Sequence, residues 1–78
     1  MYRYVIKDWT GNNFIVGGTE MPTLLGAFEE FKASHWVGST RPKFIAEDDK
    51  IIATISDDLR LTTVTAEEQL TVKLPKYK

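Results

Sequence analysis

The sequence predicts an α+β domain: one antiparallel β-sheet of about five to six strands with a single helix on one face, in the order β-β-α-β-β-β-β. Two observations predict this class. Only residues 22–31 repeat their apolar positions with the period of a helix. The other apolar segments are short, rich in β-formers and separated by brief turns, which join strands antiparallel. Whether the sheet curls into a partial barrel stays open at this stage.

The composition indicates one small ordered domain spanning residues 1–78. Hydrophobic residues make up 42% of the chain and charged residues 27%, which is ordinary for a folded globular domain. Cysteine is absent, so disulfides and thiol chemistry are excluded and a cytoplasmic location is favoured. No signal-peptide pattern and no apolar run of about 18 residues is present, so we expect no membrane insertion. The net charge of −1 gives no basic footprint for duplex nucleic acid.

The first predicted element is a hairpin. Residues 2–7 alternate, and the side that carries Tyr2, Tyr4 and Ile6 is expected to face the core. A turn-rich stretch over residues 8–13 then leads into β-formers at residues 14–16. Gly17 and Gly18 end this hairpin and reverse the chain.

The predicted helix begins at Pro22, which suits a first helical position because its missing N–H costs nothing there. At 100° per residue, one side of the helix is expected to hold Leu24, Leu25, Ala27, Phe28 and Phe31, and the other Gly26, Glu29, Glu30 and Ala33. The apolar side is expected to supply much of the core. We therefore expect replacement of Phe28 or Phe31 by alanine to unfold the domain.

The second half of the chain reads as a loop followed by strands. Residues 34–42 are rich in Gly, Ser and Pro and predict an irregular loop. Further strands are predicted over residues 43–47, 50–56, 59–65 and 69–74, with Asp48 and Asp49 forming the acidic tip of a second hairpin. Thr65 and Glu68 match a helix capping box, although the β-branched residues on both sides favour a turn.

No arrangement of residues predicts catalysis. His35 is the only histidine, so neither a pair of histidine metal ligands nor a second imidazole is available. The carboxylate clusters stand mostly at turns and lack the spacing of a calcium loop, so solvated turn charges are the simpler interpretation. We therefore expect no enzyme activity, no metal and no cofactor.

Two features suggest a surface that binds a partner. The outer helix face is nearly smooth at Gly26, with Glu29 beside it, and glycine inside a helix costs about 1 kcal/mol relative to alanine. Tryptophan and arginine, the types enriched at interface hot spots, follow in the loop. The predicted partner-binding residues are Trp36, Arg41, His35, Gly26, Glu29 and Trp9. Trp36 has an alternative role, as a lid that packs under the end of the helix.

The function that this pattern favours is a non-catalytic intracellular protein-interaction module, an inhibitor or regulator that occludes a larger protein partner, as a monomer or homodimer. A second hypothesis is a single-stranded nucleic-acid binder that uses the aromatic and basic residues Tyr2, Arg3, Tyr4, Lys7, Trp9, Trp36, Arg41 and Lys43. A third is an accessory domain that self-associates through an exposed edge strand.

Overall fold

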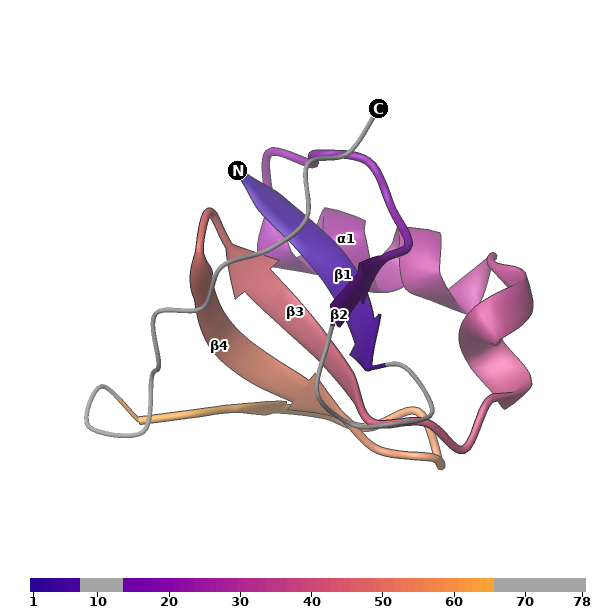
Figure 1. Ribbon diagram of the computed structural model, residues 1–78. Helices are drawn as coiled ribbons and strands as arrows, with labels where there is room; N and C mark the ends of the chain where they lie inside the picture. Colours follow the sequence, from indigo (N-terminus) through magenta and orange to yellow (C-terminus); the bar gives the residue numbers. More distant parts are fainter. Residues whose placement is uncertain (8–13, 66–78) are drawn as a thin grey trace.

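The computed structural model describes residues 1–7 and 14–65, which form an antiparallel sheet, one α-helix and a short 3₁₀ helix (Figure 1). The elements are β1 (Tyr2–Lys7), β2 (Phe14–Val16), α1 (Leu24–Lys32), η1 (His35–Gly38), β3 (Lys43–Glu47), β4 (Lys50–Ile55) and β5 (Leu61–Thr63). The α+β class with an antiparallel sheet is therefore confirmed. The predicted strand over 69–74 lies outside the described residues and stays a prediction.

The five strands of the sheet lie in the order β2-β1-β3-β4-β5, and every neighbouring pair is antiparallel. Helix α1 connects β2 to β3 and covers one face of the sheet (Figure 1). This connection returns the chain to the free side of β1, so β1 and β3 become inner strands although they are distant in sequence. The C-terminal end of β1 and the N-terminal end of β3 therefore lie at the same end of the sheet, next to the segment that follows α1.

The β3–β4 hairpin has the acidic tip that the sequence predicts. Glu47 pairs with Lys50, which leaves Asp48 and Asp49 as a two-residue turn. Asp48 has a φ of 56°, in the left-handed region that such turns require and that aspartate tolerates better than most residues. Both aspartates are exposed, so the tip is a solvated anionic end of the molecule.

The core lies between α1 and the sheet. Its buried residues are Tyr4, Ile6, Ala27, Phe31, Ile45, Ala53 and Ile55. The rings of Tyr4 and Phe31 meet edge to face, with centroids 5.5 Å apart, and the Tyr4 hydroxyl donates to the Gly17 carbonyl at 2.6 Å. Tyr2 also packs against this cluster, so the predicted core-facing side of β1 is confirmed.

Strand β1 is buried more completely than its alternation predicts. Val5, which alternates with Tyr4 and Ile6 and so faces the side opposite α1, has no exposed surface. Ala46 of β3 is equally buried. The expectation of a half-exposed strand is therefore wrong for the middle of β1, where side chains on both faces of the strand are buried.

The helix starts later and presents a narrower apolar face than predicted. Thr23 is the N-cap, and its hydroxyl accepts from the Gly26 N–H at 2.9 Å, so Pro22 precedes the helix and is not its first residue. Leu25, expected in the core, is 65% exposed. The stripe formed by Leu24, Ala27, Phe28 and Phe31 already fills the side that faces the sheet, and Leu25 lies 100° away from Leu24 around the axis.

Two further segments differ from their predicted form. The loop predicted over residues 34–42 contains η1, whose single turn is too short to show a period in the sequence. The strand predicted over residues 59–65 is shortened to β5. Leu59 has a φ of 64° and belongs to the turn that reverses the chain after β4, so it cannot extend the strand.

Candidate functional site

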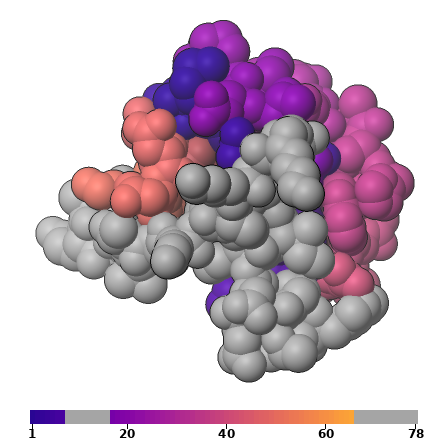
Figure 2. Space-filling view, turned by 45° about the horizontal axis from the view of Figure 1, so that its top comes forward, coloured from indigo at the N-terminus to yellow at the C-terminus, as the bar shows by residue number. Residues whose placement is uncertain are grey.

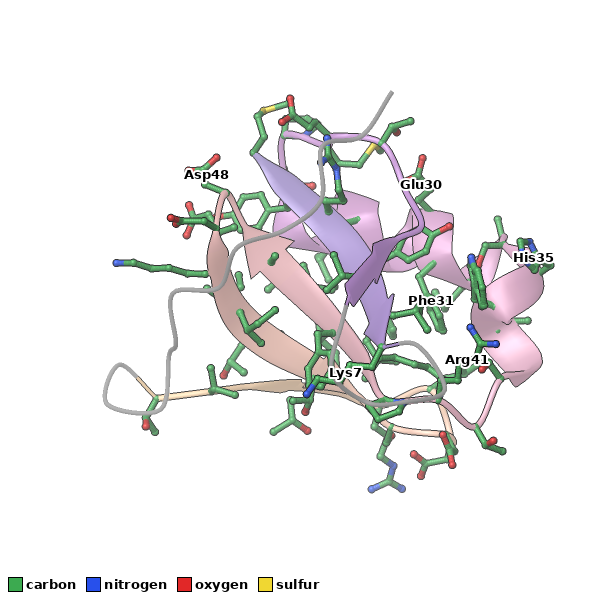
Figure 3. All side chains as sticks on the ribbon, viewed as in Figure 1. Lys7, Glu30, Phe31, His35, Arg41 and Asp48 are labelled. Atoms are coloured by element: carbon green, nitrogen blue, oxygen red, sulfur yellow. The ribbon has the colours of Figure 1, made fainter. Side chains whose placement is uncertain are left out.

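His35, Trp36 and Arg41 gather at the end of the molecule beyond the C-terminus of α1, and we refer to these three residues as the Trp36 cluster. The imidazole of His35 lies 4.6 Å from the indole of Trp36, centroid to centroid, with 35° between the ring planes. The guanidinium carbon of Arg41 lies over the same indole, 5.3 Å from its centroid. His35 and Arg41 are labelled at this end of the molecule in Figure 3. Guanidinium and indole in this arrangement attract one another through the ring quadrupole.

Ser34 fixes the position of the cluster relative to α1. Its hydroxyl donates to the Phe31 carbonyl at 2.6 Å and accepts from the Trp36 N–H at 3.2 Å. One side chain therefore joins the last turn of α1 to the first turn of η1. Because serine is a good cap for a helical turn, this local sequence explains why η1 forms directly after α1.

Two more hydrogen bonds fix the segment that carries Arg41. The hydroxyl of Ser39 accepts from the Arg41 N–H at 3.1 Å, and the Lys7 N–H donates to the Pro42 carbonyl at 3.0 Å. The second bond connects the segment to the end of β1. The Trp36 cluster is therefore held on a structured segment, which lowers the ordering entropy that binding must overcome.

Trp36 lies at the boundary between the core and the surface. It packs against the core cluster, as does Val37, yet both side chains remain partly exposed. His35 is exposed, and a Cβ added at Gly38 would have no atom within 4 Å. Part of the Trp36 side chain therefore remains at the surface, while its packing against the core fixes its position.

The remaining predicted site residues are not part of this cluster. Gly26 lies in the first turn of α1, where a Cβ would approach the Thr23 hydroxyl to 2.9 Å and Met21 to 3.5 Å. The absence of a side chain at Gly26 therefore makes room for the N-cap hydroxyl, a local reason for glycine that the sequence analysis did not identify. Glu29 is exposed and pairs with Lys32 at 2.7 Å. Trp9 lies outside the described residues.

One ion pair near the cluster, between a buried lysine and an exposed aspartate, was not predicted from the sequence. Lys43, two residues after Arg41, is only 2% exposed, and its ammonium lies 2.5 Å from a carboxylate oxygen of Asp57. Lys43 occupies the same face of β3 as Ile45, so the alternation of the strand contained the signal. This burial removes Lys43 from the set of cations available to a ligand.

Negative charge is concentrated at the tip of the β3–β4 hairpin, whereas Lys32 and Lys43 are paired with Glu29 and Asp57. Residues 31–46 contain Lys32, Arg41, Lys43 and His35 but no aspartate or glutamate, although the whole chain has a net charge of −1. Glu47, Asp48 and Asp49 follow at the hairpin tip. Figure 3 labels Asp48 at the end of the molecule opposite His35 and Arg41. In Figure 2 the hairpin tip, in salmon, and the residues of α1 and η1, in magenta to pink, lie on opposite sides.

The negative end also affects a tyrosine. Glu47 faces Tyr2 across β3 and β1. The charge of Glu47 raises the pKa of the Tyr2 phenol above its ordinary value of 10.0, with smaller contributions from burial, a hydrogen bond to Glu47 and the charge of Asp48. The hairpin tip therefore acts as a local concentration of negative charge.

Three general features of the described residues bear on function. Residues 1–7 and 14–65 contain no group of three His, Asp or Glu side chains placed to hold a metal ion. No helix in this part of the chain has the length and apolar character needed to cross a membrane. Comparisons with protein-family models, curated proteins and solved structures give no significant match.

Proposed function

We propose that the chain is a non-catalytic protein-interaction module whose larger partner contacts the Trp36 cluster. The observation that supports this proposal is the partly exposed side chain of Trp36, which contacts His35 and Arg41 and lies on a capped 3₁₀ turn. Tryptophan and arginine lose much surface to a partner and are the types that dominate interface energetics. Binding at this end would occlude a surface of the partner, which is how an inhibitor or regulator of this size acts.

The arrangement supports this proposal better than it supports single-stranded nucleic acid. Base stacking needs an accessible aromatic face, and the indole of Trp36 already has an imidazole and a guanidinium against it. Tyr4 and Lys43, two of the residues that the alternative requires, are buried. Those of these aromatic and basic residues that the structure describes therefore do not all lie on one exposed surface.

Edge pairing between copies also has weak support. The outer strands of the described sheet, β2 and β5, are three residues long each. Short strands offer few backbone groups to a second chain, which is one way in which proteins limit edge-to-edge association. We therefore assign partner contact to side chains of the Trp36 cluster.

The experiment compares Trp36→Ala with Leu24→Ala in affinity capture from an extract of the native host. Both side chains are partly buried and pack against the core, so both variants are expected to lose some thermal stability. Only Trp36→Ala is expected to lose the captured protein, by roughly tenfold or more in retention, the scale of a hot-spot truncation. The proposal would be contradicted if both variants retained the captured protein equally. It would also be contradicted if the wild-type chain captured no protein.

A further inference from the structure

We infer that Leu59, in the turn between β4 and β5 (residues 56–60), makes a second contact with the partner by entering an apolar pocket on the partner's surface. This inference rests on the proposed function and extends the contact beyond the Trp36 cluster. Leu59 is 38% exposed, whereas Leu61, two residues further on, packs against the core cluster. The turn therefore presents a large apolar side chain to solvent, while the strand that follows it does not.

Leu59 has a backbone conformation that a leucine rarely adopts, since its φ of 64° lies in the left-handed region. Its N–H donates to the Ser56 carbonyl at 3.0 Å, and the Ser56 N–H donates to the Arg60 carbonyl at 2.9 Å. These bonds close a hairpin loop of three residues, in which the left-handed position usually holds glycine or asparagine. Either residue would form the same turn with less strain, so the geometry of the turn does not explain the leucine.

The hairpin between β3 and β4 shows the ordinary solution to the same problem. Within residues 1–7 and 14–65, Asp48 and Leu59 are the two non-glycine residues with a positive φ. Asp48 is exposed and polar, and aspartate tolerates the left-handed region well. Leu59 combines the same backbone with an apolar side chain at the surface. Local rules of this kind are broken at functional sites, where the unfavourable backbone and the exposed apolar group serve binding and not stability.

Side-chain contacts hold this turn in one conformation. The Ser56 hydroxyl accepts from the Arg60 N–H at 3.0 Å and donates to the Asp58 carboxylate. Asp58 also pairs with the Arg60 guanidinium at 3.2 Å, and Asp57 pairs with the buried ammonium of Lys43 at 2.5 Å. Both carboxylates of the turn are therefore engaged within the chain, and the group that the turn offers to a partner is the leucine. A turn fixed in this way loses little conformational entropy on binding.

The turn lies at the same end of the molecule as the Trp36 cluster. Ile55, the last residue of β4, pairs with Lys43, the first residue of β3, so the turn follows β4 beside the N-terminal end of β3. The contact between Lys43 and Asp57 joins the two segments, and Arg41 of the cluster lies two residues before β3. Figure 1 shows the turn, in light orange, next to the segment that leads from η1 into β3. One partner surface can therefore meet both the Trp36 cluster and Leu59.

The test separates the geometry of the turn from the chemistry of the side chain, using the full chain in affinity capture from the native-host extract. Leu59→Asn suits the left-handed backbone and removes the apolar group. It should melt at or above the parental temperature and retain about fivefold less of the captured protein, or lower still. Leu59→Met keeps an apolar side chain on the same backbone and should retain the protein. Thr62→Gln, at an exposed position on β5, is the control and should match the parent in both measurements.

A crosslink provides the direct evidence of contact. Photoleucine, a photoreactive analogue of leucine, is incorporated at position 59 of the full chain, and the chain is irradiated in the same extract. It should crosslink to the protein that Trp36→Ala loses, and mass spectrometry should place the crosslink among apolar residues of that protein.

Three results would overturn the inference. A melting temperature of Leu59→Asn below that of the parent would mean that the leucine serves stability. Parental retention by Leu59→Asn would mean that the partner does not bind the leucine. A photoleucine crosslink to this chain or to a second copy of it would assign Leu59 to a contact other than the partner. If Leu59→Asn retains the protein that Trp36→Ala loses, the proposed function stands and only the second contact is wrong. If both variants retain it, the proposed function fails as well.

Discussion

Tyr2 and Glu47 face each other at the negative end of the sheet, and their contact predicts a measurable titration. Replacing Glu47 by Gln removes the largest cause of the raised pKa, so the pKa of Tyr2 should fall toward 10.0. Carbon-13 NMR of the tyrosine ring against pH measures it directly. An unchanged pKa in Glu47→Gln would show that burial and not charge controls this phenol.

The same shift gives a pH dependence of stability with a defined sign. Because the folded-state pKa lies above the unfolded value, the neutral phenol favours the folded state. This contribution is complete below pH 10.0 and is lost as the pH rises from there through the folded-state pKa. Alkaline unfolding should therefore be less steep in Glu47→Gln than in the parent.

The pair formed by Lys43 and Asp57 predicts losses of stability of unequal size for its two members. Asp57→Ala leaves a buried ammonium without its carboxylate and should cost about 1–3 kcal/mol, at the lower end because Asp57 itself is 70% exposed. Lys43→Met fills the same space with an apolar chain and leaves only an exposed carboxylate, so it should cost less. Urea unfolding of both variants measures the difference, and a larger loss in Lys43→Met would contradict this interpretation.

Leu25 and Lys43 show the limit of sequence reasoning for single residues. Both sit on patterns that were read correctly as helix and strand, yet Leu25 is exposed and Lys43 is buried. Periodicity assigns a side chain to a direction, while its burial depends on which neighbours arrive from distant parts of the chain. Asp57, whose carboxylate makes the burial of Lys43 tolerable, lies in a turn that periodicity does not describe.

At the scale of the element, α1 predicts a sharp contrast along its length. Phe31 is fully buried against Tyr4, whereas Leu25 is 65% exposed. Phe31→Ala should cost about 3–5 kcal/mol, which approaches the whole stability of a small domain, and Leu25→Ala should stay within about 0.5 kcal/mol. Thermal unfolding of the two variants checks the orientation of the helix, and similar losses would refute it.

Gly26 predicts a coupling between the N-cap and the helix interior. Gly26→Ala should gain up to about 1 kcal/mol of helix propensity only when Thr23 no longer occupies the space of the new methyl group. The substitution should therefore stabilise the Thr23→Ala background more than the parent, by about 0.5 kcal/mol or more in a double-mutant cycle. Equal gains in both backgrounds would mean that the contact with Thr23 does not explain Gly26.

The strands were predictable from sequence to different extents for physical reasons. Residues 2–7 and 43–47 alternate or concentrate β-formers without interruption, and both predicted segments match β1 and β3. The segment from residue 59 does not, because the left-handed backbone of Leu59 is set by the turn that closes on Ser56. One turn of 3₁₀ helix at η1 has no sequence period, so its capping by Ser34 is visible only in the structure.

At the scale of the molecule, the sequence located the candidate site but not its construction. His35, Trp36 and Arg41 belong to one predicted loop, and the structure brings them into contact. Their ring contacts depend on η1 and on the bond from Lys7 to Pro42, which joins segments far apart in the chain. The separation of the anionic hairpin tip from His35 and Arg41 likewise follows from the direction of β3 and not from composition (Figure 3).

The most direct test of the central claim adds a side chain beside Trp36 without removing any contact. Gly38→Gln places new atoms in open space next to the Trp36 cluster, so the melting temperature should remain close to that of the parent. Thr62→Gln, at an exposed position on β5, serves as the matched control. Gly38→Gln should lose the captured partner while Thr62→Gln retains it, and both variants should keep the parental melting temperature. Full retention by a folded Gly38→Gln would show that the partner contacts another surface.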